Sequence, residues 1–332
     1  MLGKRNKGIF IVFVCFVFLS IFILASIPGG ENPLSLSIVV KNGTSLYNIG
    51  KKLKAADVIN STNLFVLVSL IRGGKLIAGE YEFRKNMSTL AIVNKMVRGE
   101  RTLYILQIVE GHNIYDVAET IEKKNIMKKD EFLRLAKDRE FLKGLGIETG
   151  SLEGYLSPDT YYYSKEIDVR RFIEKIARRT LKYFEQEDVK KQMTVMGLDV
   201  RKTLILASMI EKEAKVADEK PLISAVFHNR LLKGMSFDSD PTVIYGTKAF
   251  RSPIRKSDLT TYTPYNTYAF RGFPKGPICN PDKNSIAAAL SPAPVDYLYF
   301  VSKNDGTHVF SKDMSEHNKY VSMYQRSKST KK

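Results

Sequence analysis

The feature that most constrains this chain is an uncharged apolar run near its N-terminus. The run extends from Gly8 to Ile27 and reads GIFIVFVCFVFLSIFILASI. A helix of about 20 apolar residues is long enough to cross a hydrocarbon core of about 30 Å. The run has no polar face to present to water, which argues against a buried core helix. The sequence therefore predicts one transmembrane helix over residues 8–27.

The charges that flank the run predict its orientation. Basic residues precede it at Lys4, Arg5 and Lys7, and the next charged residue is Glu31. Because basic residues stay on the cytoplasmic side, residues 1–7 form a cytoplasmic tail and the rest of the chain lies outside. A cleaved signal peptide is the alternative, but signal peptides have shorter apolar runs and end in a small-residue cleavage site. We expect a single-pass protein of the cell membrane with an extracytoplasmic folded part.

Composition limits the partners and the compartment. The net charge of +17 favours an acidic partner, such as a membrane surface or an anionic wall polymer. In the basic segment Phe172–Tyr183 no aromatic stacking platform interleaves the charges, so nucleic acid is not an expected partner. Of the two cysteines, Cys15 lies in the apolar run, so Cys279 is left without an internal disulfide partner.

After a breaker-rich linker over residues 28–36, two segments share one pattern. Val39–Ile49 and Ile108–Val117 each contain a β-branched stretch, a glycine, a polar residue that can cap a helix, and apolar residues at helical spacing. The pattern predicts two strand–glycine–helix units, although any α/β protein can contain such units. Further helices are expected at Leu64–Ile71, Ser88–Val97, Phe172–Tyr183 and Leu222–Leu232, and a strand at Ala78–Phe83. The fold class that follows is α+β.

The strongest candidate for chemistry lies on a predicted helix over residues 204–214. With a period of 3.6 residues, Glu211 falls on a face of small and apolar residues, so its carboxyl should be partly desolvated. Desolvation raises the pKa of a carboxyl, as a general acid near neutral pH requires. Glu213 points about 200° away, towards Lys212 and Lys215. The alternative is that both glutamates are surface residues paired with lysines.

The loops that follow suit a polar ligand with apolar faces. Asp238-Ser239-Asp240-Pro241 has the composition of a turn, and residues 262–268 and 272–281 are rich in Tyr, Asn, Thr, Gly and Pro. Aromatic faces together with amide and hydroxyl groups suit a sugar. The four histidines form no metal-binding pattern and no nucleotide-binding loop is present, so neither a metal nor a cofactor is predicted.

Several ordered motifs together resemble the MltG/YceG family. They cover most of residues 36–324 and are Glu153-Gly-Tyr-Leu-Ser-Pro-Asp-Thr-Tyr161, Leu206-Ala-Ser-Met-Ile-Glu-Lys-Glu213, Asp240-Pro-Thr-Val-Ile-Tyr-Gly246, Tyr265-Asn-Thr-Tyr268 and Gly276-Pro-Ile-Cys-Asn-Pro281. Ser157 and Cys279 depart from the residues expected at their positions, but neither is the expected acid.

The resemblance implies an endolytic murein transglycosylase. Such enzymes cleave the β-1,4 bond between N-acetylmuramic acid and N-acetylglucosamine in nascent glycan strands, leave a 1,6-anhydro end and so terminate strand elongation. It also implies a LysM-like membrane-proximal region over 37–135 and a catalytic domain over 136–325. The polar, basic composition of residues 326–332 separately predicts a disordered tail. Peptidoglycan strands are the implied substrate, and peptidoglycan synthases are candidate partners.

The same resemblance assigns site residues. The essential glutamate of the family maps onto Glu211, with Glu213 as the second choice. Residue type and motif membership indicate substrate-binding residues at Asp240, Thr242, Tyr245, Asn266, Tyr268 and Asn280. Two other functions stay open: a glycan-binding scaffold that recruits synthases without catalysis, and a hydrolytic muramidase that would need Asp240 or another acid as its second carboxylate.

Overall fold

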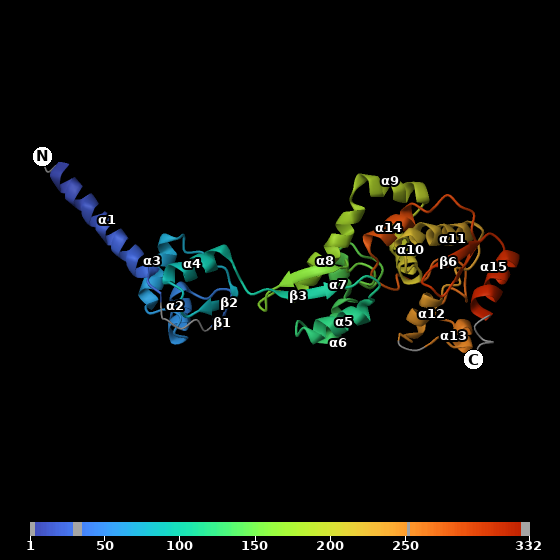
Figure 1. Ribbon diagram of the computed structural model, residues 1–332, viewed down its shortest axis with the longest axis horizontal. Helices are drawn as coiled ribbons and strands as arrows, with labels where there is room; N and C mark the ends of the chain where they lie inside the picture. Colours follow the sequence, from blue (N-terminus) through green and yellow to red (C-terminus); the bar gives the residue numbers. More distant parts are fainter. Residues whose placement is uncertain (1–3, 29–34, 251–252, 327–332) are drawn as a thin grey trace. The chain divides into compact units, whose positions relative to one another are not determined.

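The computed structural model describes residues 4–28, 35–250 and 253–326 (Figure 1). Most of the predicted linker 28–36, the basic tail 327–332 and the first three residues of the predicted cytoplasmic tail lie outside this part of the chain. The chain packs into two units, of which unit 1 is Met1–Ile105 with Tyr162–Ile167 and unit 2 is Leu106–Tyr161 with Asp168–Lys332. In the described residues, helices and three two-stranded sheets make a mixed α+β structure, which confirms the predicted class.

Helix α1 (Lys4–Ser26) contains the apolar run. Its segment Ile9–Ser26 has a mean hydropathy of 3.0 and is long and apolar enough to cross a membrane. The helix contacts α3 (Thr62–Ile71) and α4 (Thr89–Arg98), and Pro28 forms a β-bridge with Ser88. The apolar helix is therefore confirmed as a helix, and it is packed onto unit 1 at its C-terminal end.

The rest of unit 1 is a strand–helix–helix–strand arrangement with one further helix. Strand β1 (Ser35–Val40) pairs antiparallel with β2 (Gly79–Arg84), so that Ile38 lies opposite Tyr81. Helices α2 (Leu46–Ala55) and α3 connect the two strands in sequence. Apolar side chains of both strands and of α2, α3 and α4 form one buried core, which makes this unit a packed domain in its own right.

Both strand–glycine–helix segments form as predicted. Gly43 and Gly111 have φ values of 79° and 75°, in the left-handed region that favours glycine. The side chain of Ser45 caps α2 and that of Asn113 caps α5 (Ile114–Lys123). The two segments belong to different units, the first to unit 1 and the second to unit 2. This division concerns packing, and the functional domains 37–135 and 136–325 stay predictions.

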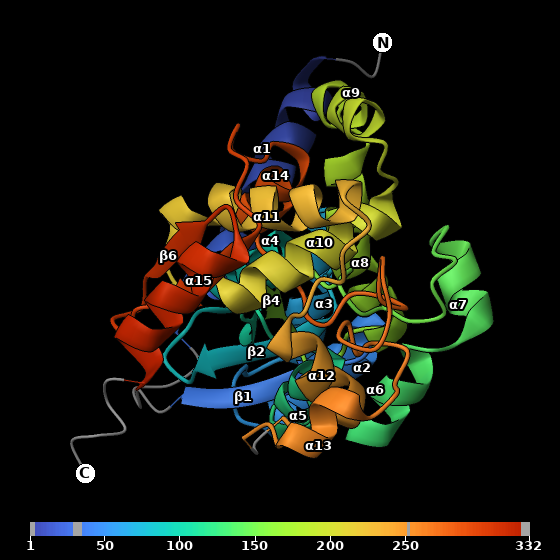
Figure 2. The same cartoon turned by 90° about the vertical axis from the view of Figure 1, so that its right-hand side faces the viewer.

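Unit 2 is built around α10 (Val200–Glu213), whose residues from Thr203 to Ile210 are all buried. It packs against α11 (Lys220–Leu232), α12 (Asp240–Thr247) and α14 (Lys283–Leu290), as Figure 2 shows for α10, α11 and α14. The remaining helices are α6 (Lys129–Leu135), α7 (Arg139–Gly144), α8 (Val169–Phe184), α9 (Glu187–Met196), α13 (Lys256–Thr260) and α15 (Met314–Val321). Strand β5 (Tyr299–Ser302) pairs with β6 (His308–Ser311) in this unit, whereas β3 (Tyr104–Ile108) pairs with β4 (Asp159–Tyr163), and the residues of both these strands are divided between the two units.

One local prediction was wrong. Asp240 and Pro241 were expected in a turn, but they begin helix α12. Proline is well suited to the first turn of a helix, where its missing N–H would have no intrahelical partner. The same residues therefore open a helix when the following segment, Thr242–Thr247, packs against α10.

Candidate active site

Glu211 lies in the last turn of α10 with a side chain that is only 7 % exposed. Its Oε2 atom accepts hydrogen bonds from Lys220 Nζ at 3.2 Å, the Asp282 backbone N–H at 3.0 Å and Ser285 Oγ at 2.6 Å. Within the described residues, Oε1 receives no hydrogen bond. The two carboxylate oxygens of Glu211 therefore differ, since the donors that the structure describes all bind Oε2.

The donors around Glu211 come from the starts of two helices. Asp282 and Ser285 belong to the N-terminal end of α14, where backbone N–H groups and the helix dipole favour a negative charge. Lys220 begins α11, and its Nζ also lies 2.9 Å from Asp282 Oδ1. Burial raises the pKa of Glu211, while these donors and the Lys220 cation oppose the rise. The predicted desolvation of Glu211 is confirmed.

Glu213 lies in a separate polar site. Its Oε1 accepts a hydrogen bond from Ser239 Oγ at 2.7 Å. Burial raises the pKa of Glu213 to about 7, and the neighbouring charge of Asp240 adds to the rise. Helix α10 therefore holds two desolvated carboxyls in different surroundings, and a raised pKa alone does not distinguish the general acid between them.

A third buried carboxyl, Glu153, was missed by the sequence reasoning as a site residue. Both of its oxygens lie 3.1 Å from the Ile114 backbone N–H, and Oε2 accepts from the Tyr245 hydroxyl at 2.7 Å. Burial raises the pKa of Glu153 to about 8. Only its place in a family-like motif could have pointed to it, since its neighbours in sequence are Leu152 and Gly154.

Asn280 joins two segments beside Glu211. Its Nδ2 donates to the His112 carbonyl at 2.8 Å, and its Oδ1 accepts from the Leu156 N–H at 2.9 Å. The backbone N–H of Gly111 in turn donates to the Asn280 carbonyl at 3.0 Å. The side chain is fully buried, so this geometry gives Asn280 a positioning function.

Three other predicted ligands are also occupied by internal contacts. Asn266 is buried and its Nδ2 donates to the carbonyls of Asp258, Leu259 and Thr261. Thr242 is buried and its hydroxyl donates to the Ser239 carbonyl. The Tyr245 hydroxyl is used by Glu153. Thr242 contacts Ser239, the partner of Glu213, and Tyr245 contacts Glu153, so these contacts lie beside the other two carboxyls and not at Glu211. The roles of the three residues as direct glycan ligands stay predictions.

Asp240 and Tyr268 differ from this group because both are exposed. The Tyr268 hydroxyl donates to Asp240 Oδ1 at 2.7 Å, and the Tyr268 side chain keeps 38 % exposure. Burial and the Asp240 carboxylate both raise the pKa of Tyr268. A carboxylate and an aromatic ring that are accessible together suit the hydroxyl edge and apolar face of a sugar.

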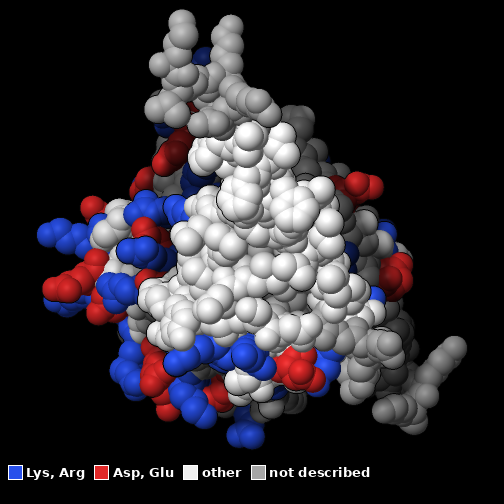
Figure 3. Space-filling view, turned by 90° about the vertical axis from the view of Figure 1, so that its left-hand side faces the viewer, with Lys and Arg blue, Asp and Glu red and all other residues white. Residues whose placement is uncertain are grey.

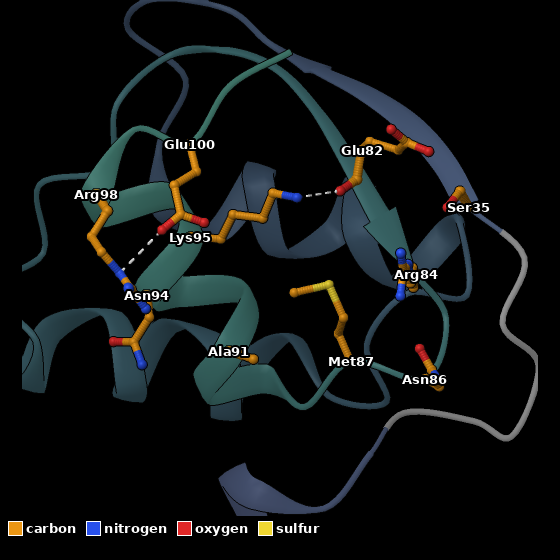
Figure 4. Close-up of a pocket in the computed structure, with 10 residues that line it drawn as sticks. All are labelled: Ser35, Glu82, Arg84, Asn86, Met87, Ala91, Asn94, Lys95, Arg98 and Glu100. Atoms are coloured by element: carbon orange, nitrogen blue, oxygen red, sulfur yellow. Dashed lines mark hydrogen bonds and ion pairs between the residues drawn. The ribbon is translucent and has the colours of Figure 1, made fainter.

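Cavities with polar walls occur in both units. One, of about 420 Å³ in unit 2, borders Asp282 and contains Asp159, Arg179 and Lys283 in its wall. The other, of about 540 Å³ in unit 1, is lined by β1, β2 and α4 (Figure 4). Its charged groups include the ion pair Arg98–Glu100. No group of His, Cys, Asp and Glu side chains in the described part of the chain is arranged to hold a metal.

Comparison with known proteins decides the family. The sequence model of the YceG-like family matches residues 38–323. This chain belongs to the YceG-like family. Among its relatives, the endolytic murein transglycosylase of Bacillus subtilis (strain 168) is 33 % identical over 319 residues, which are 91 % of this chain and 88 % of that protein.

More distant relatives and a solved structure agree with this YceG-like assignment. The endolytic murein transglycosylase of Streptococcus pneumoniae (strain ATCC BAA-255 / R6) is 25 % identical over 329 residues; the match covers 88 % of this chain but 59 % of that longer protein. A crystal structure of a YceG-like protein from Listeria monocytogenes superposes with a TM-score of 0.60 at 32 % identity, over 87 % of this chain and all of that one. The resemblance stated from the motifs is confirmed.

Proposed function

We propose that this YceG-like chain is an endolytic peptidoglycan lytic transglycosylase that uses Glu211 as its single acid/base. The observation that carries the proposal is the environment of Glu211. Its carboxyl is desolvated, three donors bind its Oε2 atom, and Oε1 receives no hydrogen bond from the described residues. The family membership and the relatives named as endolytic murein transglycosylases support the reaction class.

The reaction needs one carboxyl in two protonation states. Protonated Glu211 donates its proton to the glycosidic oxygen, and the bond from that oxygen to C1 of N-acetylmuramic acid breaks. The resulting carboxylate takes the proton from the C6 hydroxyl of the same sugar, whose oxygen bonds to C1 and closes the 1,6-anhydro ring. Because the nucleophile is intramolecular, positioning supplies much of the rate. The donors on Oε2 hold the carboxyl in place, and Oε1 is the oxygen that exchanges the proton.

The exposed pair Asp240 and Tyr268 is the proposed glycan contact. Thr242, Tyr245, Asn266 and Asn280 support the loops from inside, and we propose that their replacement lowers turnover through misplacement of those loops. In the muramidase alternative, Asp240 would act as a second carboxylate and become as essential as Glu211.

The location of the reaction follows from α1. We propose that α1 anchors the chain in the cell membrane with the N-terminus in the cytoplasm, because Lys4, Arg5 and Lys7 precede the apolar segment. The predicted LysM-like region over 37–135, most of which belongs to unit 1, would then be membrane-proximal. The strand–helix–helix–strand order of β1, α2, α3 and β2 supports that assignment. Recruitment of peptidoglycan synthases stays a prediction.

The test is a product analysis with a matched pair of variants. Purified peptidoglycan is digested by the wild type, Glu211→Gln and Glu213→Gln, and the released muropeptides are weighed. The proposal expects anhydro ends from the wild type and from Glu213→Gln, and none from Glu211→Gln. The two variants make the same chemical change on the same helix, so a general effect of the substitution would affect both.

The other outcomes identify the alternatives. Reducing ends, heavier by one water, would establish hydrolysis and direct the search for a second carboxylate to Asp240. Loss of activity only in Glu213→Gln would transfer the acid/base role to Glu213. If Glu211→Gln matched the wild type in cleavage and in glycan binding, the chain would be a scaffold or would use another acid.

A further inference from the structure

Unit 1 carries an apolar surface that neither its core nor the proposed reaction uses. Helix α3 buries Phe65, Val68 and Ser69 in the core. On its other face, Leu67, Leu70 and Ile71 are 40 %, 59 % and 51 % exposed. These three residues, with their spacing of three and four, form one stripe along the helix, which we call the α3 stripe.

The α3 stripe is continuous with the apolar surface of α1. An apolar groove of about 780 Å³ lies between the two helices, with Leu19 and Phe22 from α1 and Val68 and Ile71 from α3 in its wall. Figure 3 shows a broad area without Lys, Arg, Asp or Glu side chains on the side of the molecule that carries α1, with basic and acidic side chains around it. One apolar surface therefore runs from the candidate membrane span onto the folded unit.

The position of the groove along α1 fixes its depth. Leu19 lies seven residues before Ser26, the last residue of the apolar segment, which is about 10 Å along a helix that rises 1.5 Å per residue. Half of a hydrocarbon core is about 15 Å. If α1 spans the bilayer, the C-terminal turn of α3 lies beside it at the depth of the outer leaflet.

Charge at the end of α3 fits the same location. Arg72 follows Ile71 directly, Lys75 comes three residues later, and both side chains are exposed. Long basic side chains next to an apolar stripe can extend from the acyl chains to the phosphate groups that lie above them. An apolar face that buries about 5–10 Å into the boundary of headgroups and acyl chains is typical of helices that lie on a membrane surface.

We propose that α3 is a second membrane contact, and that the α3 stripe inserts into the outer leaflet while Arg72 and Lys75 bind lipid phosphates. The proposal rests on the proposed membrane crossing of α1. It goes beyond an anchor, because it adds a second helix of unit 1 to the part of the chain that contacts lipid. With α3 inserted, unit 1 is held against the membrane at two places.

The absence of tryptophan in the sequence makes the test direct. Single-tryptophan variants of the full chain are placed in vesicles of phosphatidylglycerol and phosphatidylethanolamine, with and without brominated acyl chains. Leu70→Trp reports the α3 stripe, Phe13→Trp reports the span of α1, and Tyr47→Trp on α2 is the control for an exposed position elsewhere in unit 1. Brominated lipid quenches tryptophan within the acyl chains, and acrylamide quenches tryptophan in water.

The proposal expects Leu70→Trp and Phe13→Trp to lose most of their emission to brominated lipid and little to acrylamide, and Tyr47→Trp to show the reverse. If brominated lipid quenched neither Phe13→Trp nor Leu70→Trp, the proposed membrane crossing of α1 would be refuted. Quenching at Phe13→Trp without quenching at Leu70→Trp would leave the anchor and overturn the second contact. In that case, protection of Leu70→Trp from acrylamide would mean that a protein, such as a second copy of this chain, covers the stripe.

The headgroup contact has its own matched test. Charge reversal by Arg72→Glu with Lys75→Glu is compared with Lys51→Glu with Lys54→Glu on α2, each in the Leu70→Trp background. The two pairs change the net charge equally. The first pair should reduce lipid quenching of Leu70→Trp and the second should leave it unchanged. Equal effects of the two pairs would refute a specific role for Arg72 and Lys75.

Discussion

Lys220 is the residue whose removal tests the proposed site most directly. Its Nζ bridges Glu211 Oε2 at 3.2 Å and Asp282 Oδ1 at 2.9 Å. The side chains of Lys220 and Glu211 are 8 % and 7 % exposed, so solvent screens this pair little. Removal of one partner from a buried ion pair costs about 3–5 kcal/mol, because the remaining charge loses its compensation.

We expect Lys220→Met to lower the free energy of unfolding by about 3–5 kcal/mol at pH 8. The loss should be smaller at pH 5, since the pKa of Glu211, already raised by burial, would rise further without the cation and the carboxyl would take up a proton. The measurement is urea-induced unfolding of the detergent-solubilised chain, followed by circular dichroism at both pH values.

Two further variants make the result interpretable. Lys215→Met removes an exposed lysine and should change stability by no more than about 0.5 kcal/mol. The double variant Lys220→Met with Asp282→Asn lacks one of the two carboxylates that Lys220 binds, and asparagine can still cap α14. It should therefore recover part of the free energy of unfolding that Lys220→Met loses. Equal urea midpoints for Lys220→Met and Lys215→Met at pH 8 would refute the reasoning.

The same substitution should move the pH profile of activity. A general acid must be protonated when the substrate binds, so activity falls as the pH rises through its pKa. Without the cation the pKa of Glu211 increases, and the alkaline limb of the profile should move to higher pH. If the alkaline limb were unchanged in a folded Lys220→Met variant, the ionisation that limits activity at high pH would not be that of Glu211.

Three other predictions follow from single contacts. Burial raises the pKa of Glu213 to about 7 in the folded chain. The folded state therefore keeps the proton to higher pH than the unfolded state, and the free energy of unfolding should fall as the pH rises from about 4.5 to 7. Glu213→Gln should reduce the difference between the free energies measured in urea at pH 5 and pH 8, and an unchanged difference would contradict the raised pKa of Glu213. Asn280→Ala leaves the His112 carbonyl and the Leu156 N–H without their partner and should cost about 2–5 kcal/mol, measured by urea unfolding; a cost below about 1 kcal/mol would show that water replaces the amide. Burial raises the pKa of the Cys279 thiol well above its usual range, so maleimide should label Cys279 only after denaturation, and rapid labelling of the native chain, read by mass spectrometry of its peptides, would contradict its burial.

The parts of the structure that could be predicted are those encoded within a few residues. Ser45 and Asn113 lie directly before apolar residues at helical spacing, and each caps its helix as expected. The desolvation of Glu211 followed from the period of α10, because the face that carries it was already apolar in the sequence.

The missed parts depend on contacts between distant positions. Lys220 and Ser285 reach Glu211 only through the packing of α11 and α14 on α10. Asn280 and His112 are separated by 168 positions. Asp240-Pro241 was misjudged because turns and first helical turns favour the same residues, and only packing distinguishes them.

The two strand–glycine–helix turns have different surroundings, and they should therefore vary to different degrees as the sequence evolves. A Cβ atom placed at Gly43 would meet no described atom within 4 Å, whereas one at Gly111 would lie 3.8 Å from Lys212 and 3.9 Å from Glu211. The turn around Gly111 is also fixed by backbone hydrogen bonds, because Gly111 donates to the Asn280 carbonyl and Asn280 donates to the His112 carbonyl. During divergence, the first turn can therefore accept insertions and new side chains that still allow its backbone, while the second can change only together with the segment around Asn280 that is hydrogen-bonded to it.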